Sequence, residues 1–198
     1  MTATGDGTGI NFSTGGVYFA QDADDRALVR RALAGEHEAF EALVERFKRV
    51  FFTVALRMLG DRDEAADAVQ NAFVKIYQKL DTFDPSRRFF SWAYRVLVNE
   101  CLNTQRARRQ FEPLSLDVPG GGDPLESLEA DERRRRVQAA ILALPHESRE
   151  VVVLRHFTEL SYEEIGAALH LPPQIVKSRL HTARHRLAQL LIGFKGND

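Results

Sequence analysis

The chain lacks the features of a disulfide-bonded, secreted or membrane-spanning protein. Cys101 is the single cysteine among 198 residues, so no internal disulfide forms, which suits a reducing compartment. No run of about 18 apolar residues is present, so no membrane-spanning helix is predicted. The first residues include no basic segment followed by an apolar stretch, so we expect no secretory signal. These absences predict a cytoplasmic protein that does not insert into membranes.

The sequence also has little that could carry catalysis. It contains no phosphate-binding loop, no pair of acid and base residues in a recognisable setting, and no cluster of metal ligands. His181 and His185 stand four residues apart, but a zinc site needs further ligands that the neighbouring sequence does not supply. We interpret Cys101 as a small core residue of a helix, with a redox role as the alternative. We therefore expect no enzyme activity, no cofactor and no metal.

Net charge is nearly absent, because 27 lysines and arginines balance 28 acids to a formal net charge of −1. The distribution of charge is uneven, however. Residues 86–111 hold six arginines and one glutamate, and residues 173–198 hold five basic residues and one acid. Between them, residues 112–130 hold five acids and no base. Two basic segments separated by an acidic one predict two separate contacts with a polyanion such as DNA.

Strand patterns are nearly absent, and apolar residues instead recur at intervals of three and four along most of the chain. Gly35, Gly60 and Pro85 interrupt this periodicity and divide the first half into separate helices. The apolar face of the third helix includes Ile76 and Tyr77. We predict an all-α protein with helices over residues 24–34, 36–59, 61–80, 89–109, 125–144 and 145–157, followed by two more.

Prolines and glycines gather in the acidic stretch around residues 113–124, which is typical of a linker between domains. The glycine- and threonine-rich opening of the chain is typical of a flexible tail. We predict two small helical domains joined by a flexible linker. The expected parts are a tail over residues 1–21, a domain over 22–111, the linker over 112–128, a second domain over 129–192 and a tail over 193–198.

A helix-turn-helix is predicted in the second domain. Ser161 and Glu164 have the spacing of a capping box, and the helix that they begin ends near His170. The next helix begins near Pro173, where the missing amide proton has no cost. Its polar face fits the major groove of B-DNA, and a helical hairpin with a solvated basic face is the alternative. That face comprises Gln174, Lys177, Ser178 and His181, flanked by Arg179, Arg184 and Arg186.

Two sets of motifs resemble a known family. Residues 144–155, 160–165 and 176–184 resemble the fourth domain of sigma factors, most of all the small extracytoplasmic-function group within the sigma-70 family. Residues 67–73 and 90–99 resemble the second domain of the same group. The resemblance covers about residues 22–192, with the motifs in the family's order. The chain departs from the family pattern at Asn71, where an acid is usual, at Gln174-Ile175, where Gly-Thr is usual, and at Thr182, where arginine is usual.

The resemblance implies a function that composition alone does not. Such a protein joins core RNA polymerase through the β′ and β subunits and directs it to promoter DNA, here for a stress or envelope-response regulon. The second domain meets the polymerase clamp and opens the minus-10 element, and the fourth domain reads the minus-35 element. A dedicated anti-sigma factor is a further expected partner. The alternative is a stand-alone helix-turn-helix regulator, which would bind duplex DNA without polymerase.

The resemblance also assigns residues to three surfaces. The expected polymerase-binding residues share one polar face of the third helix, where a solvated surface is the alternative. The expected minus-10 residues combine aromatic rings for unstacked bases with arginines and asparagines, although some of these rings could only anchor a loop to the core. They are Asp67, Gln70, Asn71 and Val74 for polymerase, Phe83, Arg87, Arg88, Phe89, Trp92, Arg95, Asn99 and Asn103 for the minus-10 element, and Gln174, Lys177, Ser178, Arg179, His181 and Arg184 for the minus-35 element.

Overall fold

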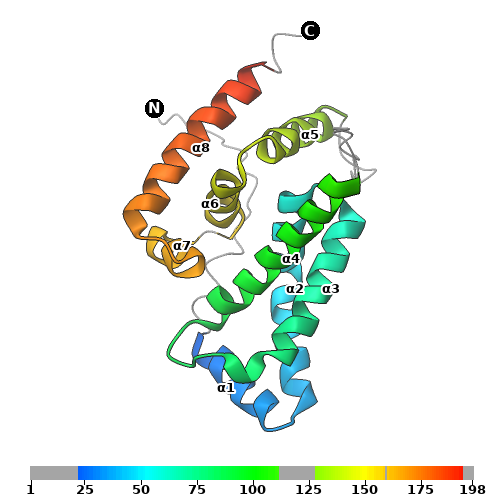
Figure 1. Cartoon of the computed structure of the whole chain (residues 1–198), viewed down its shortest axis with the longest axis vertical. Helices are drawn as coiled ribbons and strands as arrows, with labels where there is room; N and C mark the ends of the chain where they lie inside the picture. Colours follow the sequence, from blue (N-terminus) through cyan, green and yellow to red (C-terminus); the bar gives the residue numbers. More distant parts are fainter. Residues whose placement is uncertain (1–21, 112–127, 159, 194–198) are drawn as a thin grey trace, which may run out of the picture.

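The computed structural model describes residues 22–111, 128–158 and 160–193, and these residues form helices and short loops with no strand (Figure 1). The expected all-α class is confirmed. The predicted tail over residues 1–21 lies outside the described residues, as does nearly all of the predicted linker and of the C-terminal tail. The helices are α1 (Asp22–Leu33), α2 (His37–Leu59), α3 (Arg62–Gln78), α4 (Phe89–Phe111), α5 (Leu128–Leu142), α6 (His146–Phe157), α7 (Tyr162–Leu169) and α8 (Pro173–Gly193), with a 3-10 turn over Leu80–Thr82.

Local signals set most of the helix ends. Gly60 follows α2 with a φ of 83°, a left-handed conformation that glycine adopts without steric cost. Asp61 then caps α3, because its carboxylate accepts the amides of Asp63 and Glu64 at 2.9 Å each. The third helix stops at Gln78 rather than at residue 80, and a single 3-10 turn follows it.

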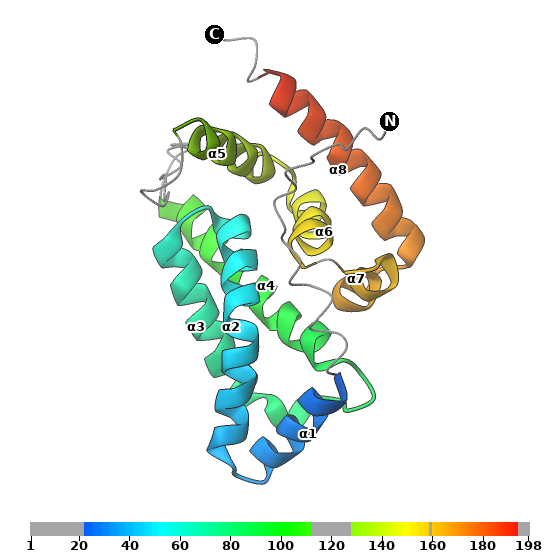
Figure 2. The same ribbon diagram turned by 180° about the vertical axis from the view of Figure 1, so that it is seen from behind.

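The first four helices enclose an aromatic core. The ring of Phe47 lies 5.9 Å from that of Phe51, 5.7 Å from Phe89 and 5.8 Å from Phe90, measured between centroids. Each aromatic pair at this separation stabilises the fold by about 0.5–1.5 kcal/mol, in addition to the stabilisation from burying the apolar area of the rings. Figure 2 shows α2, α3 and α4 running side by side, with α1 across one end. This core fixes α3 and α4, which carry two of the three expected surfaces.

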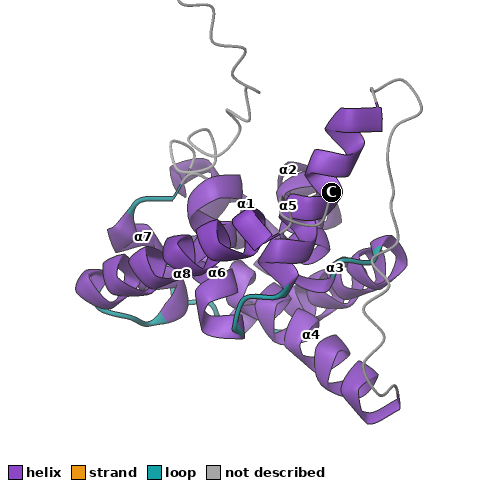
Figure 3. Cartoon of the chain, turned by 90° about the horizontal axis from the view of Figure 1, so that it is seen from above, coloured by secondary structure: helices purple, strands orange, loops and turns teal. Residues whose placement is uncertain are grey.

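In the second half, α6 is the central helix, with α5, α7 and α8 around it (Figure 1). Its residues 148–154 are all buried, because α6 packs against α8 on one side and against α2 of the first half on another. The short loops that join these helices are seen from above in Figure 3. In the described ranges, no helix is both long and apolar enough to cross a lipid bilayer.

The two halves pack directly against each other, a contact that the sequence did not predict. One hydrophobic core runs through both, including Met58 of α2 and Val153 of α6. A Cβ atom added at Gly60 would lie 2.5 Å from Cδ1 of Leu142, so the end of α2 closely approaches the end of α5. The two helical domains that the sequence predicted correspond to α1–α4 and α5–α8, and in the described residues they pack against each other.

Candidate functional site

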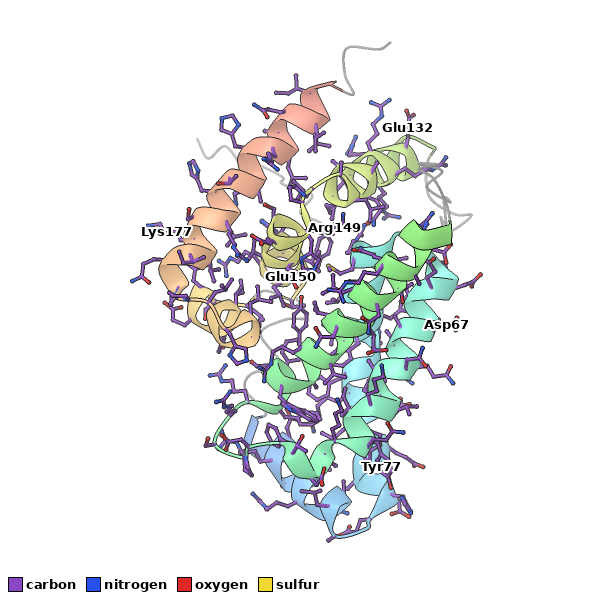
Figure 4. All side chains as sticks on the ribbon, viewed as in Figure 1. Asp67, Tyr77, Glu132, Arg149, Glu150 and Lys177 are labelled. Atoms are coloured by element: carbon purple, nitrogen blue, oxygen red, sulfur yellow. The ribbon has the colours of Figure 1, made fainter. Side chains whose placement is uncertain are left out.

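The exposed face of α3 carries the residues expected to bind polymerase. Asp67, Gln70, Asn71 and Val74 are all exposed, and Val74 keeps 49% of its surface accessible. Figure 4 shows Asp67 on the side of α3 that faces solvent. On the opposite face Ile76 is buried in the core. The periodicity of the sequence therefore identified the exposed polar face of this helix and the burial of Ile76.

Beside this face, α2 and α3 enclose an open groove of about 1000 Å³. Tyr77 lies at its edge with 46% of its surface exposed, and its ring meets that of Phe40 edge-on at 4.9 Å. The sequence placed Tyr77 on the apolar face of α3 with Ile76, but in the structure the ring of Tyr77 contacts His37 and Phe40 of α2 and stays exposed. A concave and mostly apolar surface is typical of a binding site. The groove is lined chiefly by apolar and aromatic side chains, among them Phe40, Val44, Phe52, Val69, Phe73, Val74 and Tyr77.

The loop before α4 and the first residue of α4 hold two of the expected base-stacking rings. Phe83 is 5% exposed and Phe89 is 1% exposed, and their centroids lie 5.5 Å apart. Trp92 packs against both rings, at 5.5 Å and 5.8 Å, and keeps part of its surface exposed. Since the two phenylalanines fill the core, they anchor the loop in this structure and present no open face to a base. The burial of these two rings favours the alternative that they anchor the loop, whereas Trp92 is accessible.

The remaining minus-10 residues form a stripe along α4. Asn99 and Asn103 are exposed, whereas Arg95 is half-buried. The pKa of Arg95 is lowered, mainly by its burial and to a smaller extent by the charge of Arg87. The pKa of His170 at the end of α7 is lowered, chiefly by the charge of Arg95. Partial burial and the charge of Arg87 lower it further. The turn between α7 and α8 therefore lies next to the N-terminal part of this stripe.

Arg88 is held by an acid from the second half of the chain. Its guanidinium donates to a carboxylate oxygen of Glu164 on α7, and the two side chains form an ion pair. The other oxygen of Glu164 accepts the amide of Ser161 at 2.8 Å. Burial alone would raise the pKa of Glu164, but the bonds from Ser161 and Arg88 lower it below its ordinary value. Arg88 is among the residues expected at the minus-10 element, and no local pattern in the sequence indicates Glu164 as its partner.

The helix-turn-helix forms as the sequence indicated. Ser161 caps α7 by accepting the amide of Glu164 at 3.2 Å, which completes the capping box. His170 ends α7 in a left-handed conformation with a φ of 55°. A Cβ atom at Gly166 would lie 2.5 Å from the carbonyl oxygen of Leu171, so only glycine permits this turn. The role of Gly166 was missed, although a glycine inside a predicted helix is a signal of close packing.

The outer face of α8 presents the residues expected at the minus-35 element. Gln174, Lys177, Ser178 and His181 are exposed, and so is Arg184. Figure 4 shows Lys177 pointing away from the body of the protein. The buried face of α8 lies against the core through Val176, Leu180 and Ala183.

Arg179 differs from its neighbours on α8, because it is half-buried and pairs with Glu147 of α6 at 3.0 Å. A DNA phosphate must therefore compete with Glu147 for this guanidinium. His181 and His185 are both on α8, and the described residues contain no group of three or more side chains placed to hold a metal ion.

Comparisons with known proteins agree with both motif sets. The family model for sigma-70 region 2 matches residues 43–111, and that for sigma-70 region 4 matches residues 134–187. The chain is 32% identical over 176 residues to the ECF RNA polymerase sigma factor SigW of Bacillus subtilis, covering 82% of this chain and 94% of that protein. It is also 32% identical over 182 residues to the ECF RNA polymerase sigma-E factor of Escherichia coli, covering 85% of this chain and 94% of that protein.

Solved structures extend the likeness to the fold. The structure of CnrH in complex with the cytosolic domain of CnrY matches with a TM-score of 0.68 and 30% identity, over 85% of this chain and 97% of that one. The sigma factor RpoE of Bartonella quintana, solved with the anti-sigma factor NepR, matches in fold with a TM-score of 0.65. A stand-alone helix-turn-helix regulator would leave the match to region 2 unexplained. The chain belongs to the ECF sigma factors of the sigma-70 family, which direct promoter-specific initiation of transcription.

Proposed function

We propose that this sigma factor binds core RNA polymerase through the exposed face of α3 and the groove beside it. Two large apolar side chains, Val74 and Tyr77, support this proposal because they stay exposed. They lie beside the exposed polar residues Asp67, Gln70 and Asn71. An apolar centre with a polar rim is the usual anatomy of a protein interface. The β′ and β subunits of polymerase are the partners that the family implies.

The minus-10 element contacts the stripe on α4 in this proposal. Asn99 and Asn103 present amides that can bond to base edges, and Trp92 presents a partly exposed ring on which a base can stack. Arg87, Arg88 and Arg95 supply charge for the DNA backbone. Phe83 and Phe89 support this surface from the core, because their packing holds Trp92 and the loop in place.

The minus-35 element contacts α8. Lys177 and Arg184 are exposed cations suited to phosphates, and Gln174, Ser178 and His181 lie on the same face to read base edges. Residues 22–111 then act as the polymerase and minus-10 domain, and residues 129–192 as the minus-35 domain. The protein acts in the cytoplasm by binding, with no reaction, cofactor or metal of its own. An anti-sigma factor is its proposed regulator, as CnrY and NepR bind the related sigma factors CnrH and RpoE.

The polymerase surface is tested by reversing its charge. Replacing Asp67 and Gln70 with arginine should abolish capture of core RNA polymerase by the tagged protein. Thermal unfolding should stay nearly unchanged, because substitutions at exposed sites usually alter stability by less than about 0.5 kcal/mol. The matched control replaces Ala23 and Asp24 on α1, also exposed, with arginine and adds the same charge. Full capture by the α3 variant would refute this surface.

A further inference from the structure

One exposed apolar side chain lies beside the polar residues proposed to read the minus-35 element. Ile175, in the first turn of α8, keeps 42% of its surface accessible. Other large apolar residues exposed in the described ranges lie elsewhere. Val74 and Tyr77 border the groove beside α3, and Leu33 and Ile192 lie in the last turns of α1 and α8. Ile175 is therefore the residue of this group that bound duplex DNA would meet.

The turn before α8 fixes the position of Ile175. Its amide donates to the carbonyl of Pro172 at 2.9 Å, and the next residue, Val176, is fully buried beneath the helix. Lys177 points away from the body of the protein, so this part of α8 is open to a ligand (Figure 4). Isoleucine branches at Cβ and has one strongly preferred χ1 rotamer in a helix. Ordering this side chain against a ligand therefore costs little conformational entropy.

The neighbours of Ile175 along α8 allow a base to approach it closely. Ser178 and Arg179 lie one turn further along the helix, three and four positions on. Ser178 is short and exposed, and the guanidinium of Arg179 is held by Glu147 of α6 at 3.0 Å. Thr182, two turns from Ile175, is also exposed and carries a methyl group. This edge of α8 therefore presents short and partly apolar side chains.

Thymine is the base that such an edge can recognise. In the major groove the four bases present different hydrogen-bond donors and acceptors, and thymine adds a C5 methyl group. The first residues of a recognition helix contact base edges in helix-turn-helix complexes. An isoleucine side chain neither donates nor accepts a hydrogen bond. Contact with the thymine methyl is therefore the direct means by which Ile175 can distinguish one base from another.

We propose that Ile175 determines promoter specificity by packing against the C5 methyl group of a thymine in the minus-35 element. The inference rests on the minus-35 surface proposed for α8. Gln174 and Ser178, on either side of Ile175, donate and accept hydrogen bonds at the neighbouring base edges. Burial of one methyl-sized group changes affinity about fourfold. Holoenzyme should therefore prefer thymine to uracil at this position by about that factor, because the two bases differ only in the methyl group.

The preferred minus-35 element is first identified by selection. Holoenzyme assembled from core RNA polymerase and the full chain selects the duplexes that it binds from a library of random sequence. At least one thymine should be strongly preferred within the selected minus-35 element. A selected element without thymine would overturn the role of Ile175.

Each thymine of the selected element is then replaced in turn by deoxyuridine, which removes only the methyl group. At one position the parent holoenzyme should bind the substituted duplex about fourfold more weakly in a gel-shift titration. Ile175→Ala should bind both duplexes equally, whereas Ile175→Val, which keeps a branched side chain, should retain most of the parent's preference. The matched control is Ile192→Ala, which removes an exposed isoleucine near the other end of α8 and should leave the preference unchanged.

Lys177→Ala separates failure of this inference from failure of the minus-35 surface, because Lys177 is proposed to contact phosphate. If Lys177→Ala weakens binding while Ile175→Ala keeps the parent's preference, the surface stands and the role of Ile175 is overturned. The same holds if the parent itself shows no preference for thymine over deoxyuridine at any position. If neither variant changes binding at all, the minus-35 surface is refuted, and the role of Ile175 with it. Loss of the preference in Ile175→Ala, with its retention in Ile192→Ala, is the result expected.

Discussion

Glu150 offers a quantitative test of the packing between the two halves. This carboxyl is buried on α6, and burial raises its pKa from the usual 4.5 to about 7, while the charge of Arg179 lowers it and that of Glu147 raises it further. His146 lies 3.4 Å away on the same helix. Because the folded protein holds this proton more tightly than the unfolded chain, folding is favoured at low pH by this group.

The size of the effect follows from the two pKa values. Near pH 4.5 the carboxyl of Glu150 lowers the free energy of unfolding only slightly. This destabilisation grows as the pH rises and reaches a plateau above pH 7. Since a tenfold change in proton affinity corresponds to 1.36 kcal/mol, the full cost is about 3 kcal/mol. Glu150→Gln replaces the acid with a neutral group of similar shape. The variant should therefore be more stable than the parent at pH 8, by up to about 3 kcal/mol, and the difference should shrink toward pH 5.

Urea unfolding at several pH values between 5 and 8 measures this difference directly. The control is Glu147→Gln, an acid on the same helix whose side chain is 69% exposed and pairs with Arg179. Exposed pairs contribute about 0–1 kcal/mol, so the control should show a small difference across the range. A constant difference between Glu150→Gln and the parent from pH 5 to pH 8 would refute the assignment of a raised pKa to Glu150.

Three further predictions concern single positions. Gly166→Ala should lower the free energy of unfolding by about 1–3 kcal/mol, because its Cβ would lie 2.5 Å from the carbonyl oxygen of Leu171, and thermal denaturation measures this. Tyr94→Phe should change stability by less than about 1 kcal/mol or increase it, because the buried hydroxyl has no partner among the described residues; a large loss in urea unfolding would contradict the geometry. Lys177→Ala should weaken promoter binding of the holoenzyme about equally for all sequences and reduce the salt slope by about one, as filter binding at several salt concentrations can check.

The sequence predicted the ends of helices well where the interactions that set them join residues close together in the chain. The left-handed glycine at Gly60 and the caps at Asp61 and Ser161 act within a few residues, so their effect can be read directly from the sequence. The same holds for the exposed faces of α3 and α8, whose polar residues stand at helical spacing. The expected all-α fold and the helix-turn-helix followed from these signals.

Contacts between distant residues could not be predicted in the same way. Arg149 and Met58 lie 91 residues apart, and no periodicity pairs a buried arginine with a particular carbonyl. The burial of Phe83 depends on the rings that surround it, so the sequence left core anchor and DNA contact as alternatives. Tyr77 has the spacing of a core residue, but whether another helix covers it is decided by the packing of the whole chain.

This sigma factor should give core RNA polymerase its promoter specificity. The most direct measurement is transcription in vitro from a library of bacterial genomic fragments, with core polymerase alone, with the parent protein added, and with Asp67 and Gln70 both replaced by arginine. Discrete new transcripts from a small subset of fragments are expected with the parent protein, and their loss is expected with the double variant. The same transcripts from core polymerase alone, or from the double variant at parental levels, would contradict it.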